Sequence, residues 1–507
     1  MSGKQNNSNK LTLISLVLMI FTSVFGFANM PRSFYLMGYG AIPWFILSAL
    51  TFFVPFAFMM SEYGAAFKSE KGGIYSWMAK SVNPKYAFVG TFMWYASYII
   101  WMVNVGSGIW VVVSNAIFGK DTTASWSLFG LNSTQTLGIL AIAWIILVTF
   151  VSTKGLDKIK KITSVGGTAV ALLNVVLLVG AIAVLIGNGG DIAQPIDSAK
   201  VFVKSPNPSY LTPISVLSFI VFAIFAYGGI EVTGGLVDQT ENADVTFPKG
   251  VTISAIVIAV GYAIGIFLCG IFVNWGDSLS GEGVHMANVA YVMMNNLGFE
   301  LGQAFGLSEA ISITMGDWIA RYVGISMFLA LSGAFFTLTY SPLKQVITGT
   351  PKELWPRSIA KLKDGMPINA MWIQCTIVVI MIGLVSFGGD AASKFFNKLV
   401  LMTNVAMTLP YMFISGAFYS FKKKQEIKKP FEIYKSKKGA LIATIVVTFV
   451  VGFADFFTII EPMMNGRIGD TIWSIAGPAI FTGIALIMYN NYEKKETRKN
   501  IKQDKVA

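Results

Sequence analysis

The sequence predicts an all-α integral membrane protein with about twelve transmembrane helices. The first reason is composition: 54% of the 507 residues are apolar and 13% are charged, about half the charged fraction of a soluble domain. The second is a series of apolar runs, each long enough to cross the ~30 Å hydrocarbon core of a bilayer. The third is that lysine and arginine gather in the short segments between these runs, as topology control requires.

Stretches of ~20 mostly apolar residues locate the spans in order along the chain. The expected spans are 11–38, 41–67, 86–118, 134–153, 162–187, 212–237, 249–274, 318–343, 367–388, 396–420, 439–461 and 470–490. The first run lacks an A-x-A cleavage site, so we interpret it as a retained span. We therefore expect a single transmembrane domain over 11–490, between cytoplasmic tails at 1–10 and 491–507.

The lysine distribution predicts which side each connection faces. With a cytoplasmic N-terminus, the even-numbered connections are cytoplasmic, and they hold basic clusters such as 158–161 and 422–424. The longest opposite loop, 275–317, has no lysine or arginine. We expect a multi-pass protein of the cell inner membrane with both termini in the cytoplasm. The net charge of +12 follows from this topology, and nucleic-acid binding is not expected.

Part of the long loop, from Met286 to Phe305, mixes apolar residues with Asn and Gln. Two interpretations are open: a short amphipathic helix on the outer membrane surface, or an ordinary loop packed over the helix bundle. With either interpretation the chain forms one membrane domain, because no linker or low-complexity tract occurs in it.

The first span contains residues that a continuous helix avoids near its middle. Ser23, Gly26, Asn29 and Pro31 all fall there. Proline lacks a backbone N–H and fits best in the first turn of a helix. We therefore predict one helix that ends near Thr22 and a second that starts near Asn29.

The sixth span has a comparable interruption, where Gly228 and Gly229 lie between Tyr227 and Glu231. Broken backbone hydrogen bonds are tolerated inside a membrane only where protein or a watered cavity satisfies them. Glycine also permits close helix packing, which explains a single GG pair without any site. Two interrupted spans at corresponding positions instead indicate a transporter binding site between two repeats of opposite orientation.

The exposed helix ends at these breaks offer complementary chemistry. Free N–H groups at the start of the second half of the first span can hold a carboxylate. Free carbonyls near Phe225 and Ala226 can hold an ammonium group. A zwitterion with both groups on one carbon fits between them, and Phe25, Phe27, Phe225 and Tyr227 would form an aromatic wall.

Together with other stretches, these breaks resemble the amino acid–polyamine–organocation superfamily, and within it the glutamate:γ-aminobutyrate antiporter branch. The resemblance covers essentially the whole chain. It rests on LTLISLVLMIFTSVFGFAN (11–29), MMSEYGAAFKSEKGGIYSWM (59–78), FAIFAYGGIEVTGGLVDQTEN (222–242), YSPLK (340–344) and TLPYMF (408–413). The combination is specific, although each motif alone is weak.

The resemblance implies a LeuT-like fold: a five-plus-five inverted repeat with discontinuous helices 1 and 6, plus two helices at the C-terminus. The repeats would cover about 11–187 and 212–420, and the extra helices about 439–490. It also implies substrate contacts at both breaks: Ser23, Val24, Phe25, Gly26 and Phe27 in the first, and Phe225, Ala226, Tyr227 and Gly228 in the sixth.

Two intramembrane carboxylates, Glu62 and Glu231, match glutamates that superfamily members carry in the second helix and after the sixth-helix break. Carboxylates inside spans are costly and mark functional sites. Glu231 either handles gating or protons, or simply occupies the first turn of a helix, where the dipole favours a negative charge. Glu62 either forms an inner gate ion pair or is a solvated or structurally paired carboxylate, with Lys68 and Lys71 near it in sequence.

The third span carries polar and aromatic residues at helical spacing, including Tyr98, Trp101 and Asn104. Lipid-facing packing accounts for most such stripes. Because this span would flank the central site, these three residues are candidates for reading the substrate side chain. The fifth span, 162–187, lacks the lysine that some proton-coupled relatives carry there. Its absence favours exchange or another coupling route over lysine-mediated proton coupling.

We therefore expect a secondary active transporter that moves a small amino acid or related amine by alternating access, as an exchanger. Proton- or sodium-coupled symport of such substrates, and a membrane nutrient sensor that binds without transport, are the alternatives. Enzymatic activity is not expected, because His285 is the only histidine and the carboxylates are scattered. No metal or cofactor is implied. The expected partners are the substrate and the lipid bilayer, and the oligomeric state is left open.

Overall fold

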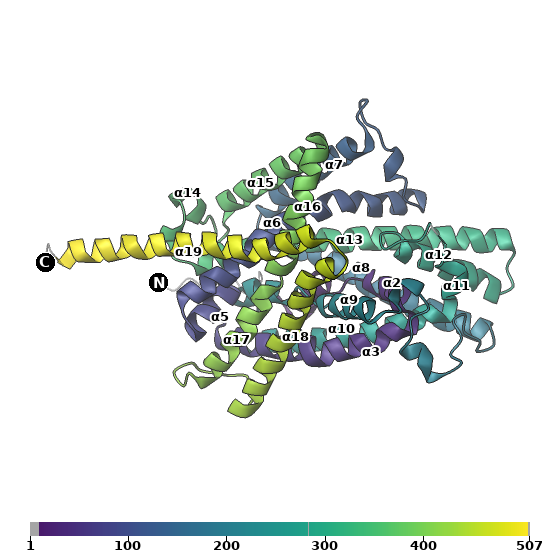
Figure 1. Cartoon of the computed structure of the whole chain (residues 1–507), viewed down its shortest axis with the longest axis horizontal. Coiled ribbons are helices and arrows are strands. Elements are labelled where there is room, and N and C mark those ends of the chain that lie inside the picture. The colour runs from purple at the N-terminus through teal and green to yellow at the C-terminus, as the bar shows by residue number, and fades with distance from the viewer. Residues whose placement is uncertain (1–9, 282, 505–507) are drawn as a thin grey trace.

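The computed structural model describes residues 10–504 except residue 282 (Figure 1). These residues form nineteen α-helices with short 3-10 and π segments, and no named strand occurs among them. Apart from Lys10, the expected N-terminal tail lies outside the described residues, as do the last three residues of the C-terminal tail.

The first two expected spans consist of several helical pieces. The first holds α1 (Leu13–Val24), α2 (Asn29–Met37) and a 3-10 turn (Gly38–Gly40). The second holds α3 (Ala41–Ser48), a π segment η3 (Ala49–Phe53) and α4 (Val54–Ala66). Further along the chain lie α5 (Gly73–Ser81), α6 (Pro84–Phe118), α7 (Ser133–Ser152), α8 (Leu156–Gly187), α9 (Pro213–Phe225), the 3-10 helix η7 (Ile230–Gln239), α10 (Ala243–Phe272), α11 (Trp275–Ser278), α12 (Val289–Ala304), α13 (Glu309–Gly349), α14 (Arg357–Ala360), α15 (Ile368–Phe387), α16 (Gly389–Ala406), α17 (Leu409–Lys423), α18 (Lys437–Met464) and α19 (Ile468–Asp504).

Side chains that satisfy free backbone N–H groups start several of these helices. Thr12 accepts a hydrogen bond from Ser15 at the start of α1, and Asn83 accepts one from Tyr86 at the start of α6. Thr212 forms a capping box before α9, whose first residue is Pro213. Caps of this type satisfy the N–H groups that a first helical turn leaves unpaired, and proline suits the first position because its missing N–H costs nothing there.

Eleven stretches of the described residues are long and apolar enough to cross a membrane. The first of them, Leu13–Ala66, has 54 residues. A straight helix of that length would measure about 80 Å, far more than the ~30 Å hydrocarbon core. Instead, both α2 and α3 pack against α10. Gly38 lies between α2 and α3 with φ 56°, and an added Cβ would lie 2.8 Å from the Pro206 ring, so glycine is required at this turn.

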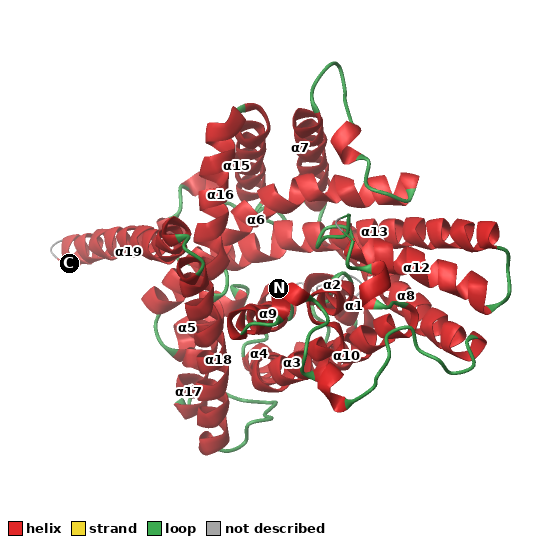
Figure 2. Cartoon of the chain, turned by 45° about the vertical axis from the view of Figure 1, so that its right-hand side comes forward, coloured by secondary structure: helices red, strands yellow, loops and turns green. Residues whose placement is uncertain are grey.

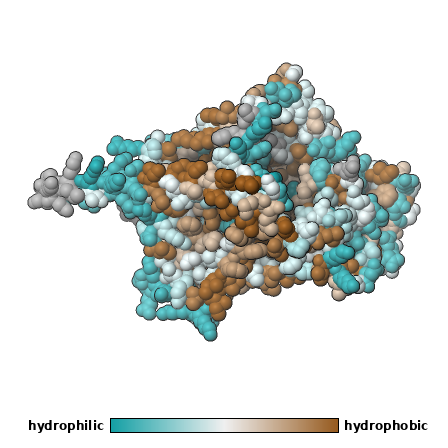
Figure 3. Space-filling view, viewed as in Figure 1, coloured by the Kyte–Doolittle hydropathy of each residue, from teal (hydrophilic) through white to brown (hydrophobic). Residues whose placement is uncertain are grey.

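The polar and apolar parts of the molecule are separated along its long axis. Apolar residues gather across the middle of the face in Figure 3, and hydrophilic residues lie toward its two ends. In Figure 1, α5, α14 and the end of α19 lie at the left, whereas α11 and α12 lie at the right. This banding is the arrangement that a bilayer requires.

The long loop after α10 contains a real helix, α12, which packs on α8 and α13. Its residues Val289, Met293, Met294 and Leu297 are buried in this contact. Figure 2 shows α12 beside α8 and α13. The segment therefore covers the bundle as a helix, a combination of the two interpretations drawn from the sequence.

Candidate functional site

The breaks in the first and sixth spans touch each other at the centre of the molecule. The chain leaves helical geometry between α1 and α2 and again between α9 and η7. Gly229 has φ 115°, and an added Cβ would lie 2.4 Å from the Ser23 carbonyl oxygen. No other residue type fits this close backbone approach at that φ, so Gly229 fixes how near the two breaks come.

Tyr262 of α10 bridges the two breaks with its hydroxyl. The Gly26 N–H donates to the Tyr262 Oη (2.9 Å), as does the Asn29 side-chain amide (3.2 Å). The same oxygen lies 3.2 Å from the Ala226 carbonyl. A donor from one break and an acceptor from the other therefore meet at one buried point. Among the described residues, the N–H groups of Phe27 and Ala28 have no hydrogen-bond partner.

An aromatic cluster surrounds this point. Phe25 stacks on the Tyr262 ring at a centroid distance of 4.7 Å, and Phe45 and Tyr227 lie at 5.2 Å from it. Tyr227 is fully buried and stacks on Phe53 at 4.6 Å. Aromatic pairs at such distances favour a fixed arrangement. Phe25 and Tyr227 thus contribute to an aromatic wall, and Tyr262 is its central member.

A cavity of about 540 Å³ opens beside the breaks. Of the predicted contact residues, it is lined by Ser23, Phe225 and Gly228, and all three candidate specificity residues of the third span border it. Its other walls come from α16, α17 and α18, through residues that include Thr403, Asn404, Thr408, Tyr411 and Thr458. The other six predicted contact residues are not part of its lining: Val24, Phe25, Gly26, Phe27, Ala226 and Tyr227. The volume lies within the ~300–1,000 Å³ typical of small-molecule sites.

Glu231 lies in the first turn of η7, directly after the sixth-span break, and is completely buried. It accepts hydrogen bonds from the Trp94 indole and the Tyr98 hydroxyl, both at 3.1 Å, and from the Gly229 N–H at 3.1 Å. The Gly229 N–H also donates to the Tyr411 hydroxyl (3.0 Å). No cation pairs with Glu231 in the described part of the chain. A carboxylate solvated only by neutral donors connects the third span to the break.

A third interruption, which the sequence analysis did not predict, lies between α16 and α17 at Met407 and Thr408. Pro410 follows in the first turn of α17. The Thr408 hydroxyl contacts the carboxylate of Asp455 on α18. Asp455 is 3% exposed, which makes it a further buried carboxylate next to the cavity.

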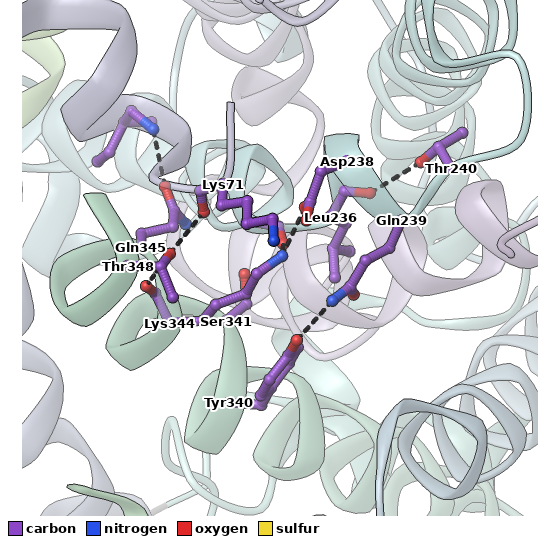
Figure 4. A network of polar contacts seen from close by, with 12 residues as sticks. Lys71, Leu236, Asp238, Gln239, Thr240, Tyr340, Ser341, Lys344, Gln345 and Thr348 are labelled. Carbon is purple, nitrogen blue, oxygen red and sulfur yellow. Dashed lines mark hydrogen bonds and ion pairs between the residues drawn. The ribbon is translucent and has the colours of Figure 1, made fainter. Parts of the chain in front are cut away.

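A network of polar contacts lies on one side of the breaks (Figure 4). The Lys344 ammonium of α13 pairs with Asp238 at 2.5 Å and donates to the Gly235 carbonyl at 2.8 Å. Ser341 donates to the Val232 carbonyl at 2.5 Å. Lys344 is only 2% exposed. Further hydrogen bonds join Gln239 to Tyr340, Gln345 to the Ile74 N–H and Thr348 to the Lys71 carbonyl. The network therefore holds η7, α13 and α5 together.

Along α13, this network separates two spaces. Leu338 lines the cavity at the breaks, whereas Tyr340 and Lys344 border a second space of about 500 Å³. That second space also touches Lys10 and Lys154. Along α13, the residues of the network therefore lie between the cavity at the breaks and the space near Lys10 and Lys154.

Glu62 lies at the same end, away from the cavity. It forms an ion pair with Lys422 of α17 at 2.7 Å, and both side chains are buried. It also accepts from the backbone N–H groups of Ile433 and Tyr434, both at 2.7 Å. Burial raises the pKa of the Tyr434 hydroxyl, which stays protonated and donates to a backbone carbonyl on α4. The partner of Glu62 is therefore Lys422, and Lys68 pairs instead with Asp244 at 2.8 Å.

Sequence reasoning missed Tyr262, Tyr411, Thr408 and Asp455. The sequence offered a direct signal for two of them. The apolar run 439–461 contains one carboxylate in its interior, Asp455, and a second at its edge, Glu461. A carboxylate inside a span is costly, so Asp455 could have been singled out by the same reasoning as Glu231. The Thr-Leu-Pro sequence at 408–410 is a helix-start signal. Tyr262 and Tyr411 lie within apolar runs and look like ordinary core residues.

Known proteins resemble this chain over most of its length. A family model described as "Amino acid permease" matches residues 11–485. The chain is 55% identical over 485 residues to "Inner membrane transporter YjeM" of Escherichia coli (strain K12), covering 95% of this chain and 96% of that protein. It is 24% identical to "Aspartate/glutamate permease AcaP" of Lactococcus lactis subsp. cremoris, over 86% of this chain and 85% of the permease. It is 21% identical to "Glutamate/gamma-aminobutyrate antiporter" of Lactococcus lactis subsp. lactis, over 89% and 84%.

These similarities extend over nearly the whole chain and confirm the resemblance to the superfamily that the sequence motifs indicated; the chain is similar to YjeM-type inner membrane transporters. The helical, apolar architecture is the one such a family requires. The protein therefore belongs to the amino acid permease family of membrane transporters.

Proposed function

We propose that the protein is a secondary active transporter that exchanges a small amino acid or related amine across the cell inner membrane by alternating access. The amino acid permease family supports transport of this substrate class. Exchange is supported by the antiporter similarity and by the fifth span, where no lysine lies in 162–187. The contact between α8 and α1 also leaves no room for a side chain at Gly167, because an added Cβ would lie 2.5 Å from the Leu18 carbonyl oxygen.

The observation that carries the proposal is the hydrogen bonding of the Tyr262 hydroxyl. It accepts from the Gly26 N–H and lies against the Ala226 carbonyl. A substrate needs the same two interactions: its carboxylate would accept from the N–H groups of Gly26 and Phe27, and its ammonium would donate to carbonyls near Ala226. The proposed contacts are those predicted from the sequence, Ser23, Val24, Phe25, Gly26 and Phe27 together with Phe225, Ala226, Tyr227 and Gly228.

The substrate side chain would extend into the cavity, toward Tyr98, Trp101 and Asn104. These residues offer one hydroxyl, one indole and one amide, and none carries a charge. Such a wall favours a neutral zwitterion or small amine over a dianion, because a second carboxylate would find no cation there.

The proposed architecture has twelve spans, with inverted repeats over about 11–187 and 212–420 and two extra helices over about 439–490. The lysine-rich end would face the cytoplasm, together with both tails. The Lys344 network lies on that side of the cavity along α13, which supports assigning the structure to an outward-facing state. The other state would open by rocking spans 1, 2, 6 and 7 against the rest.

The test is counterflow in proteoliposomes. Vesicles are preloaded with single amino acids or amines, and uptake of the same labelled compound is measured with and without a proton or sodium gradient. We expect flux that needs internal substrate but no gradient, and its loss in Gly26→Trp. Gly483→Trp is the control, because an added Cβ at Gly483 meets nothing within 4 Å. Binding without flux under all conditions would indicate a sensor and refute transport.

A coupled symporter is the second candidate, favoured by the burial of Glu231 without a paired cation. Uptake into empty vesicles driven by a gradient would support it over exchange.

A further inference from the structure

Asp455 occupies an unusual environment on α18. Its side chain is 3% exposed and lies opposite the interruption between α16 and α17. The Oδ1 oxygen contacts the Thr408 hydroxyl, and Oδ2 has no hydrogen-bond partner among the described residues. An ionised carboxylate with one oxygen unsatisfied in an apolar interior carries a large desolvation penalty.

The hydrogen bonds of Thr408 show how this penalty is avoided. Its hydroxyl oxygen lies 3.0 Å from the Val405 carbonyl and 3.2 Å from the Asn404 carbonyl, besides its contact with Asp455. A hydroxyl has one proton to donate and can also accept. If that proton goes to a backbone carbonyl, the contact with Asp455 is satisfied only when the acid carries a proton and donates it to Thr408. The geometry therefore fits a neutral Asp455.

The neighbours of Asp455 supply no compensating cation. The packed segments α9 and η3 contain no ionisable side chain. From α17 the nearby titratable group is Tyr411, whereas Lys422 at the far end of that helix pairs with Glu62 of α4 and with Glu432. Lys398, in the middle of α16, lies over the Trp473 ring at 5.1 Å. The other ionisable groups of the packed helices are Tyr63 on α4, Tyr419 and Lys423 on α17, Asp390 and Lys394 on α16, Lys437, Lys438 and Glu461 on α18 itself, and Asp470, Tyr489, Tyr492 and the charged C-terminal turns of α19.

Two contacts link Asp455 to the substrate cavity. Thr408 lines that cavity, as does Thr458, which is three residues along α18 from Asp455. Tyr411, one turn after Thr408, accepts from the Gly229 N–H at the sixth-span break. A proton can thus reach Asp455 from the cavity through the Thr408 hydroxyl, and the interruption that holds Thr408 is bonded to the break that holds the substrate.

We propose that Asp455 is a proton-binding site whose loading and release are coupled to the transport cycle. The inference rests on the proposed transport function and adds a coupling ion to it. The carboxylate takes one proton from water in the cavity while the cavity is open to one side. It releases that proton to water when the cavity opens to the other side. A proton accounts for the observed contact, because a protonated acid can donate to the Thr408 hydroxyl while that hydroxyl donates to a backbone carbonyl.

The test compares wild type with Asp455→Asn, Asp455→Glu and the control Glu461→Gln, a carboxylate at the outer end of the same helix. Each is reconstituted into proteoliposomes and assayed twice: counterflow at equal pH on both sides, and accumulation driven by an inward proton gradient. Asparagine mimics the neutral acid. Both assays use vesicles preloaded with substrate, as exchange requires. We expect Asp455→Asn to keep counterflow, now independent of pH, and to lose the additional accumulation that the proton gradient drives. Asp455→Glu restores accumulation, and Glu461→Gln behaves as wild type.

Accumulation by Asp455→Asn at the wild-type level would overturn the proposal. So would wild-type counterflow without any response to a proton gradient, or a response to sodium alone; these two results leave the transport function intact. A folded Asp455→Asn protein that elutes normally in detergent but has lost counterflow would also overturn it, by assigning Asp455 a structural role. Absence of all flux in wild type would instead refute the proposed function itself.

Discussion

The substitution Gly229→Ala tests whether contact between the two breaks matters. The added Cβ would lie 2.4 Å from the Ser23 carbonyl oxygen and 3.3 Å from its carbon, at φ 115°. A side chain at positive φ costs about 1–2 kcal/mol, and overpacking of a tight interior costs about 1–3 kcal/mol. Together these predict a penalty of about 2–5 kcal/mol in every state in which the breaks touch.

Because 1.4 kcal/mol is tenfold in an equilibrium constant, this penalty corresponds to roughly one and a half to three and a half decades. We expect counterflow in proteoliposomes to fall at least tenfold and the apparent melting temperature of the purified protein to drop. The matched control is Gly261→Ala in α10, where the added Cβ meets only the Phe25 ring at 3.7 Å. Alanine is the better helix former there, so stability should be kept or improved.

The reasoning is refuted if Gly229→Ala transports and melts like wild type. A lower melting temperature with unchanged counterflow, measured where both proteins are folded, would show that the contact stabilises the fold but takes no part in transport. If Gly261→Ala were as damaging as Gly229→Ala, the effect would come from any volume added near the site, and the specific backbone approach would not be needed.

Three further substitutions test other parts of the site. Tyr262→Phe removes the hydroxyl that bonds to both breaks and would compete there with the substrate, so the substrate should bind more tightly. The half-saturation concentration in counterflow should fall by about fivefold for one hydrogen bond of ~1 kcal/mol; a higher half-saturation concentration would contradict this. Lys344→Gln leaves Asp238 without its cation, and removing one partner of a buried pair costs about 3–5 kcal/mol. The proposed outward-facing state should then be less populated, so an impermeant reagent should label Asn404→Cys more slowly from outside; Lys68→Gln, in an exposed pair, should not have this effect. Glu62→Gln removes one of the two carboxylates that pair with the buried Lys422, the other being Glu432, and should lower the melting temperature; an unchanged value would argue against a paired role.

The long apolar helices were predictable because the bilayer imposes a length and a polarity that each run must meet; eleven stretches of the described residues satisfy both. The ends of the helices were less so. The eighth span was expected at 318–343, but α13 runs over Glu309–Gly349. Its first turns contain Glu309 and Asp317, which resemble loop residues when read in sequence. They are helical because α12 packs along them, with Asn295 donating to Asp317 at 3.2 Å.

The site was predictable only where a local backbone rule applied. Proline, glycine and the need to satisfy broken hydrogen bonds identified the breaks after Val24 and Phe225. No such rule predicts that Tyr262, on a helix far along the chain, places its hydroxyl between them. The tenth span was read as one apolar run, and its interruption at Thr408 follows from contact with α18 as much as from Pro410.

The charged pairs at the lysine-rich end fall into two groups that suit the proposed rocking motion. Lys344 joins α13 to η7, and Glu62 joins α4 to α17 through Lys422, so both pairs link the four moving spans to the remainder. The Glu62 pair is buried, and in the other pair Lys344 is buried while Asp238 is 14% exposed. By contrast, the pair of Lys68 with an aspartate joins α4 to α10 within the moving group and is largely exposed. Separating the partners of a buried pair away from water costs about 3–5 kcal/mol, whereas ion pairs exposed to water contribute about 0–1 kcal/mol. Water that enters when this end opens therefore weakens the links that must separate, while the exposed pair is little affected.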